Sequence, residues 1–283
     1  MKIDLLNKIS KNFASNLISW YSDNKRSLPW RDTKDPYKIW LSEIILQQTQ
    51  IKQGLPYYNK FVKLFPDVDS LSNSSEQKVL KNWEGLGYYS RARNLHKASK
   101  KVVNEYDSKF PKTYDELIKL PGIGDYSASA ISSFSNNEIR PVLDGNVYRL
   151  ISRLFEISIT INTSNAVKEF KKILFKLISK KYPGDFNQAI MDFGSTVCRP
   201  KNPSCYDCVF NKDCLSYQNK TVLNFPVKKK NATVKFRTFN YLVVMDFDKK
   251  IIIKKIEKKD IWQNLYNFPL IETMDKINDE III

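Results

Sequence analysis

The sequence predicts a mainly α-helical protein whose C-terminal part changes to a strand-rich pattern. Through residues 1–218, apolar side chains recur at every third or fourth position, and polar or proline-containing breaks separate these segments. From about residue 219 a basic, polar stretch leads into runs of β-branched and aromatic residues, with DFDKK as the turn of a hairpin. We therefore expect a helical domain at 1–218, a linker at 219–232 and a partial second domain at 233–283.

A clear example of the helical pattern runs from Tyr37 to Ile51, where residues of one face recur at every third or fourth position. Helical spacing places Glu43 beside the main apolar stripe, on a flank with Ile39 and Leu46. A carboxylate among apolar side chains loses solvation, so its pKa is expected to rise and it can hold a proton. The alternative is an ordinary glutamate at the edge of a helix, which is the commoner case.

Composition limits the classes of protein to consider. No run of about 18 apolar residues occurs, so no membrane span is expected, and the N-terminal MKIDLLNKISKNF has the pattern of an amphipathic helix and not of a signal peptide. The net charge of +16 favours a polyanionic partner, although a chain rich in Lys, Asn and Ile can also follow from an AT-rich genome. The single histidine, His96, excludes any site built on two histidines. We expect a cytoplasmic protein in a reducing compartment.

All four cysteines lie in one short window, at Cys198, Cys205, Cys208 and Cys214. Four thiolates within one loop-rich stretch are what a tetrahedral metal or an iron–sulfur cluster requires. Disulfides are a poor alternative, because a chain of 283 residues can bury a core without them. Zinc sites usually pair two C-x2-C motifs, and only one occurs here. The spacing therefore favours a four-iron cluster, with zinc as the competitor.

Two short motifs lie at predicted helix starts. LPGIG, at 120–124, separates two helical patterns, and Gly122 and Gly124 permit backbone conformations that a side chain would block. The free amides of the following helix would then form a phosphate site; the alternative is a tight turn with packing glycines. DGNV, at 144–147, follows an apolar run, so Asp144 would emerge at the mouth of a cleft or cap the next helix, and both roles are compatible.

These motifs, in this order, resemble the helix-hairpin-helix, iron–sulfur DNA glycosylases, specifically the adenine DNA glycosylases of the MutY type. The resembling segments, which together cover about residues 20–215, are LPWR (28–31), WLSEIILQQTQ (40–50), WEGLGYYSRARNLHKA (83–98), LPGIGDYSASAI (120–131), LDGNVYR (143–149), YPGDFNQAIMDFG (182–194) and the cysteine loop. The resemblance implies a six-helix lobe at about 32–140 and a cluster lobe formed by the N-terminal helix and 141–218, with a DNA-binding cleft between them. It also implies a [4Fe–4S] cluster and not zinc.

The resemblance implies a role for each candidate residue. Glu43 would protonate the adenine ring, and Asp144 would stabilise the sugar cation, which is the division of labour that glycosidic cleavage uses. Tyr126 and Asn146 would orient these two groups. The adenine pocket would contain Trp30, Arg31 and Gln188. The residues that enter or border the base stack would be Gln48, Thr49, Leu86 and Tyr88, with Gly122 and Gly124 on the DNA backbone. The four cysteines would hold the cluster.

The resemblance also implies the substrate and the partner. Members of this family remove adenine mispaired with 8-oxoguanine, and more weakly with guanine, after flipping it out of the helix. We therefore expect a monomer that binds double-stranded DNA with such mispairs, associated with the nucleoid in a bacterial cytoplasm. Endonuclease III-like relatives carry a lysine where this chain has Tyr126, so the sequence predicts a glycosylase that does not cut the strand. The alternatives are an endonuclease III-like enzyme for oxidised pyrimidines with lyase activity, and a non-catalytic, cluster-bearing DNA-binding protein.

The C-terminal segment from about residue 233 resembles the start of the MutT-like domain of the same family. In that family the domain inspects the 8-oxoguanine opposite the adenine. The loop expected to recognise 8-oxoguanine would lie beyond Ile283, so the preference for 8-oxoguanine over guanine is left open at this point.

Overall fold

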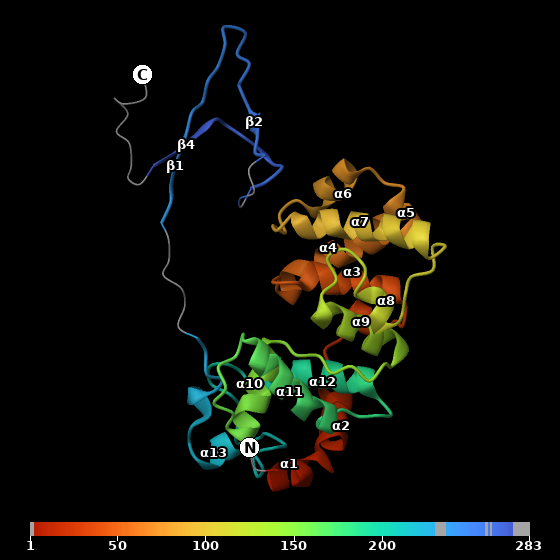
Figure 1. The fold of residues 1–283 in the computed structure, drawn as a ribbon, viewed down its shortest axis with the longest axis vertical. Coiled ribbons are helices and arrows are strands. Elements are labelled where there is room, and N and C mark those ends of the chain that lie inside the picture. Colours follow the sequence, from red (N-terminus) through yellow and green to blue (C-terminus); the bar gives the residue numbers. More distant parts are fainter. Residues whose placement is uncertain (1–2, 230–235, 258–259, 261, 274–283) are drawn as a thin grey trace. The chain divides into compact units, whose positions relative to one another are not determined.

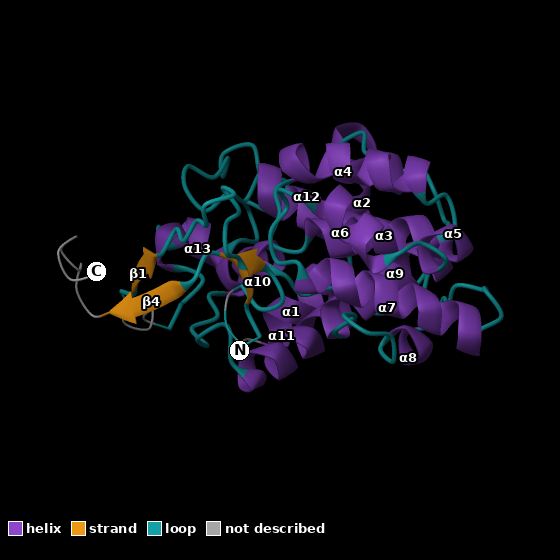
Figure 2. Ribbon diagram, turned by 90° about the horizontal axis from the view of Figure 1, so that it is seen from above, coloured by secondary structure: helices purple, strands orange, loops and turns teal. Residues whose placement is uncertain are grey.

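The computed structural model describes residues 3–229, 236–257, 260 and 262–273. The chain divides into two compact units, Met1–Lys229 and Lys230–Ile283. The first unit is built almost entirely of helices, shown in purple in Figure 2, which confirms the mainly helical fold that the sequence predicted. Among the described helices, none combines the length and the apolar character that crossing a membrane requires.

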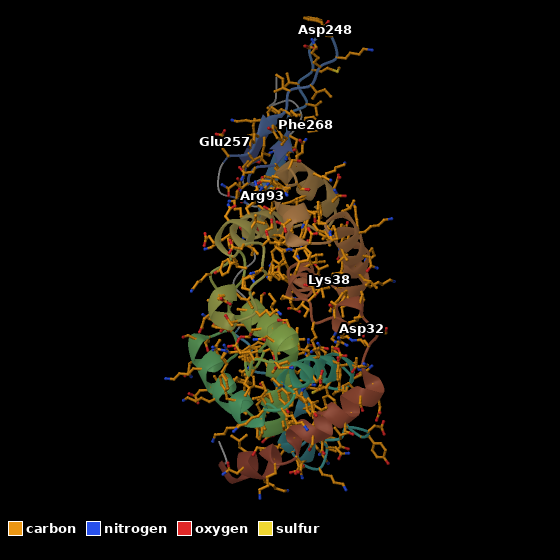
Figure 3. The ribbon with its side chains drawn as sticks, turned by 90° about the vertical axis from the view of Figure 1, so that its right-hand side faces the viewer. Asp32, Lys38, Arg93, Asp248, Glu257 and Phe268 are labelled. Atoms are coloured by element: carbon orange, nitrogen blue, oxygen red, sulfur yellow. The ribbon has the colours of Figure 1, made fainter. Side chains whose placement is uncertain are left out.

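The helices of the first unit form two lobes, which Figure 1 shows one above the other. The hairpin lobe contains α3 (Pro36–Leu46), α4 (Ile51–Leu64), α5 (Val68–Ser72), α6 (Glu76–Trp83), α7 (Ser90–Glu105), α8 (Tyr114–Leu117) and α9 (Asp125–Asn136). The cysteine lobe contains α1 (Ile3–Ser10), α2 (Phe13–Asn24), α10 (Gly145–Phe155), α11 (Ser164–Leu177), α12 (Pro183–Thr196) and α13 (Leu215–Gln218). Two short 3-10 helices, η1 (Pro29–Arg31) and η2 (Val222–Asn224), complete the unit. In Figure 3, Asp32, which follows η1, lies at the junction of the lobes.

Both lobes have apolar cores, and α9 joins them. Trp40 and Trp83 are fully buried in the hairpin lobe, and Phe13 and Phe186 are fully buried in the cysteine lobe. Burial of each such side chain contributes roughly 1.5–3 kcal/mol. Helix α9 contacts α3 in its own lobe and α12 in the other, so the lobes share one packed junction.

The segment from Tyr37 to Ile51, which has a helical apolar pattern, contains a break in the structure. Helix α3 begins after Asp35, whose carboxylate accepts a hydrogen bond from the Tyr37 backbone N–H at 2.9 Å. It ends at Leu46, and α4 starts only at Ile51. Between them Gln48 has a φ of +55°, a left-handed conformation that a right-handed helix does not contain. The apolar spacing does not reveal this break, because it carries no information about where the backbone carbonyls find their donors.

The turn before α9 has the conformation that its glycines allow. Gly122 has a φ of +78°, and a Cβ added there would lie 2.7 Å from the Cβ of Asn94 on α7. Gly124 occupies the N-cap position of α9, so no capping side chain covers the first amides of the helix. These amides are the free donors that a helix N-terminus offers to an anion.

The first unit continues beyond residue 218, where the sequence predicted a linker to begin. The Ile161 backbone N–H donates to the Val227 carbonyl at 3.0 Å. Arg153 on α10 donates from Nε to the Val222 carbonyl at 2.9 Å and to the Phe225 carbonyl at 3.1 Å. These bonds hold residues 222–227 against the cysteine lobe.

The second unit contains two short antiparallel strand pairs among its described residues. They are β1 (Thr238–Tyr241) with β4 (Leu270–Thr273), and β2 (Lys254–Lys255) with β3 (Tyr266–Asn267). The predicted hairpin turn is present, because the Asp246 backbone N–H donates to the Lys250 carbonyl at 2.9 Å. Arg237 forms ion pairs with Asp260 and Glu272 at 2.6 Å each, which tie three segments of this unit together.

Candidate active site

The first unit contains a cavity of about 240 Å³ that both lobes line. The hairpin lobe contributes side chains from α3 and α9, and the cysteine lobe contributes side chains from the start of α10 and from α12. The predicted site residues in its wall are Trp30, Arg31, Glu43, Thr49, Tyr126, Asp144, Asn146 and Gln188. The fold therefore brings together the candidate acid, the candidate carboxylate and the candidate base-binding side chains.

Glu43 lies on α3 with Ile39 and Leu46, which also line the cavity. Burial raises the pKa of its carboxyl from 4.5 to about 7, and the charge of Asp144 adds to the rise, while Arg31 opposes it. The rise that the apolar flank predicted is therefore present. At neutral pH about half of such carboxyls are protonated, so Glu43 can donate a proton to a bound group.

Asp144 caps α10 and faces the same cavity. Its Oδ1 accepts hydrogen bonds from the backbone N–H groups of Asn146 and Val147, both at 2.8 Å, and its Oδ2 accepts one from Asn146 Nδ2 at 2.9 Å. These three donors fix the position of the carboxylate at the start of the helix. The two roles that the sequence suggested for Asp144, cap and cleft residue, occur together.

Tyr126 stands between these two carboxyl groups and α12. Its hydroxyl donates to the Sδ of Met191 at 3.2 Å. Burial raises its pKa well above the ordinary value, and the charges of Glu43 and Asp144 add to the rise. The group is therefore a neutral phenol, able to donate a hydrogen bond but unable to act as an amine nucleophile.

Buried contacts hold two of the candidates for base binding, Arg31 and Gln188, in place. Asp192 accepts hydrogen bonds from Nη1 and Nη2 of Arg31, both at 2.5 Å, and is also paired with Arg26. Burial acts to raise the pKa of Asp192, but the hydrogen bonds from Arg31 and Arg26 outweigh it, so the pKa lies below its usual value. Tyr21 donates from its hydroxyl to Gln188 Oε1 at 2.7 Å. With its oxygen held in this way, the Gln188 amide keeps its NH₂ group as a donor.

The other candidates for DNA contact lie outside the cavity lining. Gln48 is exposed on the loop between α3 and α4, and Tyr88 is 64% exposed on the loop before α7. Leu86 is buried beneath the second loop. Gly122 and Gly124 lie in the turn before α9. Apart from Thr49, which lines the cavity, the structure thus separates the residues predicted for chemistry from those predicted to contact the stack and the backbone.

The four cysteines line a second cavity, in the cysteine lobe. Burial raises the pKa of Cys208 to about 12 and that of Cys214 to about 11, and the neighbouring cysteines contribute to each rise. Such thiols ionise together only when a bound cation compensates their charge. Within the part of the chain that the structure describes, no three ligand-type side chains are grouped for a single metal ion. Four sulfur donors around one cavity suit a tetrahedral metal ion or an iron–sulfur cluster.

Two buried arginines on α10 contact the cysteine segment. Arg153 Nη1 lies 3.4 Å from the Sγ of Cys198. Arg149 donates from Nε to the Cys198 carbonyl at 2.7 Å and from Nη2 to Asn146 Oδ1 at 2.8 Å. Because Asn146 in turn donates to Asp144, hydrogen bonds connect the cysteine segment to the wall of the first cavity.

Several residues of the site were not predicted from the sequence. Asp192 could have been found, because an acidic residue in the apolar helix segment QAIMDFG requires a buried cation as its partner. Tyr21 and Met191 give no such signal, since aromatic and apolar residues at helical spacing are usually core residues. Arg26 lies in a polar loop, where a basic residue is expected on composition alone.

Comparisons with known proteins agree with this geometry. Residues 41–176 match the family model described as HhH-GPD superfamily base excision DNA repair protein. The solved structure of a thermostable thymine-DNA glycosylase superposes with a TM-score of 0.70 at 28% identity, over 75% of this chain and 98% of that chain. Endonuclease III in a non-covalent complex with DNA has a TM-score of 0.65 at 20% identity, over 76% and 97%, and shares the fold. Fold and site together define the class of helix-hairpin-helix base excision repair proteins.

Relatives of known activity narrow this class. The adenine DNA glycosylase of Buchnera aphidicola subsp. Schizaphis graminum is 39% identical over 266 residues, which are 93% of this chain and 76% of the relative. The adenine DNA glycosylase of Mus musculus is 38% identical over 215 residues, which are 73% of this chain and 42% of the relative. The chain belongs to the adenine DNA glycosylase family.

Proposed function

We propose that this protein is a monofunctional glycosylase that removes adenine mispaired with 8-oxoguanine or guanine from double-stranded DNA. The observation that carries the proposal is the pair of carboxyl groups in one cavity: Glu43, with a pKa of about 7, and Asp144, whose carboxylate accepts three hydrogen bonds. Membership of the adenine DNA glycosylase family supports the choice of base. The net charge of +16 supports a polyanionic partner.

The adenine has to leave the base stack, because its glycosidic bond cannot be reached inside the duplex. Gln48 and Tyr88, on their two exposed loops, would fill the space that the base vacates, with Thr49 and Leu86 beside them. Stacking of a base on an aromatic side chain such as Tyr88 is worth roughly 1–3 kcal/mol. The free amides at the start of α9 would hold a phosphate of the bent strand.

Inside the cavity the two carboxyl groups have different tasks. Glu43 donates its proton to a ring nitrogen of adenine, so that the base leaves as a neutral molecule with the electrons of the glycosidic bond. The sugar develops positive charge at C1′, and the Asp144 carboxylate stabilises it. Water then adds to C1′, and its proton returns to Glu43. Arg31 and Gln188, fixed by Asp192 and Tyr21, offer the hydrogen-bond donors that orient the base.

Tyr126 supports a reaction that stops at base removal. Cutting of the strand by a lyase requires an amine that forms a Schiff base with the sugar. The described residues that line the cavity include no lysine, and Tyr126 stands where endonuclease III-like relatives are expected to carry one. The endonuclease III-like alternative is therefore disfavoured, although the fold is shared.

We further propose that the four cysteines hold a [4Fe–4S] cluster. When bound, the cluster would supply four bonds that fix the segment from Cys198 to Cys214. Arg153, whose guanidinium lies beside the Cys198 sulfur, would compensate part of the thiolate charge. Metal analysis of purified protein is expected to give about four irons per chain with matching sulfide. Stoichiometric zinc without iron would contradict the assignment.

Residues 233–283 are proposed to form the opening part of a MutT-like domain that inspects the base opposite the adenine. The two antiparallel strand pairs of the second unit are compatible with the start of such a domain. We propose that the protein acts as a monomer, with both carboxyl groups and the base-binding side chains supplied by one chain.

Duplexes with adenine opposite guanine or 8-oxoguanine, and one with thymine glycol, test the proposed activity. Each is incubated with purified protein and analysed with and without alkali. The proposal predicts cleavage of the adenine-containing strand only after alkali. Direct cutting of the thymine glycol strand without adenine release would assign the protein to the endonuclease III class, and binding without any release would make it a non-catalytic DNA-binding protein.

A further inference from the structure

Arg91, at the start of α7, is 8% exposed and has no carboxylate partner among the described residues. Its guanidinium donates instead to the carbonyl oxygens of Ile44, Ile45, Gln47, Leu86 and Gly87 and to the hydroxyl of Thr49. A buried cation surrounded by backbone carbonyls is costly to desolvate, and burial lowers the pKa of Arg91. Such an arrangement needs a structural reason.

The acceptors of Arg91 belong to two separate loops. Nη1 bonds the C-terminal end of α3, with the Ile45 carbonyl at 3.0 Å, where the helix leaves carbonyls without donors. Nη2 bonds the loop before α7, with the Leu86 carbonyl at 3.1 Å and the Gly87 carbonyl at 3.2 Å. One planar guanidinium therefore holds both loops at a fixed separation.

Each of these loops contains an exposed side chain on a strained backbone. Gln48 has a φ of +55° and Tyr88 a φ of +48°, and neither is a glycine. A residue held in such a conformation costs about 1–3 kcal/mol and persists only where its surroundings impose it. The Arg91 guanidinium also lies 5.7 Å from the Tyr88 ring centroid and 5.2 Å from that of Trp83. The Trp83 indole donates to the Gly87 carbonyl at 3.0 Å, so the second loop has two donors.

We propose that Arg91 is a positioning residue that sets the Gln48 and Tyr88 loops in register before DNA binds, so that both side chains enter the base stack together. The inference rests on the proposed function, because it assigns these two side chains to the stack. It also explains why the apolar pattern from Tyr37 to Ile51 does not form one helix: the carbonyls at the end of α3 bind Arg91. Loops ordered in advance do not lose conformational freedom on binding.

Arg91→Lys in the full-length protein tests the inference. Lysine keeps the charge but has three donors on one nitrogen, so it cannot reach the acceptors of both loops. The probe is a duplex with 2-aminopurine next to an adenine opposite guanine, because its fluorescence rises when neighbouring bases unstack. We expect the fluorescence rise on binding to fall by about half or more and single-turnover excision to slow at least about tenfold.

Two control variants lie on the same helix. Arg93→Lys makes the same substitution at a residue that does not bond the two loops and is paired with Glu76 instead. Arg93 lies on the hairpin lobe in Figure 3, and this variant is expected to behave like the unchanged protein. Val102→Ala removes fully buried volume about three turns along α7 and is expected to lower the melting temperature without changing the fluorescence rise. Together the two controls distinguish an effect of loop position from an effect of the Arg-to-Lys exchange itself and from a general loss of stability.

A double-mutant cycle with Tyr88→Ala distinguishes positioning from an independent contribution. If Arg91 acts through the two loops, the double variant is expected to be little slower than the slower single variant. Three results would each overturn the inference. The rate losses of the two single variants could multiply in the double variant, the Arg91→Lys protein could unstack the probe normally, or it could fail to fold at all. Failure of the unchanged protein to release adenine would instead refute the proposed function, while the fluorescence rise on binding would still test Arg91.

Discussion

Burial of Glu43 beside Asp144 destabilises the fold whenever the Glu43 carboxyl is charged. Its pKa rises from 4.5 to about 7 on folding, so the folded state favours the protonated form. The stability associated with this group is fully present below pH 4.5 and is lost as the pH rises through about 7. The loss at higher pH is on the order of 3 kcal/mol.

Glu43→Gln is therefore expected to abolish excision and to stabilise the protein above pH 7. The amide keeps the shape of the side chain, holds no transferable proton and never carries a charge. Urea unfolding at pH 5 and at pH 8 measures the difference, which should be small at pH 5 and about 3 kcal/mol in favour of the variant at pH 8. Glu105→Gln, at an exposed position on α7, is the matched control, and equal stability of Glu43→Gln and the unchanged protein at pH 8 would contradict the assigned environment.

Substitutions of Asp144, the N-cap residue of α10, separate its structural role from its chemical one. Asn and Asp cap helices about equally well, because both side chains accept hydrogen bonds from the first backbone amides. Asp144→Asn is expected to keep the melting temperature and to lose excision, since the charge that stabilises the sugar is gone. Asp144→Ala is expected to lose excision and about 1 kcal/mol of stability. Substantial excision by Asp144→Asn would leave Asp144 as a cap alone.

The elements also show which parts of the site the sequence could predict. Local signals were sufficient for the cysteine grouping and for the cap at Asp144, because each depends on near neighbours in the chain. The apolar flank of Glu43 indicated the direction of its pKa shift, but Asp144 and the far wall of the cavity also contribute to it. The break after α3 and the pairing of Asp192 with Arg31 depend on contacts between distant segments. Apolar periodicity contains no information about those contacts, so it does not indicate the loop that presents Gln48.

At the scale of the whole molecule, the first unit contains every residue that lines the candidate cavity. It also has its own apolar core. A chain that ends after Lys229 is therefore expected to fold with helix content matching this unit and to release adenine opposite guanine at roughly the rate of the full chain. The ratio of excision opposite 8-oxoguanine to excision opposite guanine is expected to fall, if the second unit inspects the opposite base.

Circular dichroism and single-turnover assays on both chain lengths check this expectation. Loss of helical structure on truncation would show that the first unit depends on the second. An unchanged ratio for the two opposite bases would remove the second unit from recognition without affecting the assignment of the cavity.

The most direct test of the central claim is the pH dependence of single-turnover adenine release from an adenine–guanine duplex. Because Glu43 must be protonated to donate, the rate is expected to be level below about pH 7 and to fall about tenfold for each pH unit above it. A rate that increases through pH 7, or that is independent of pH up to 9, would contradict the account of Glu43 as the proton donor.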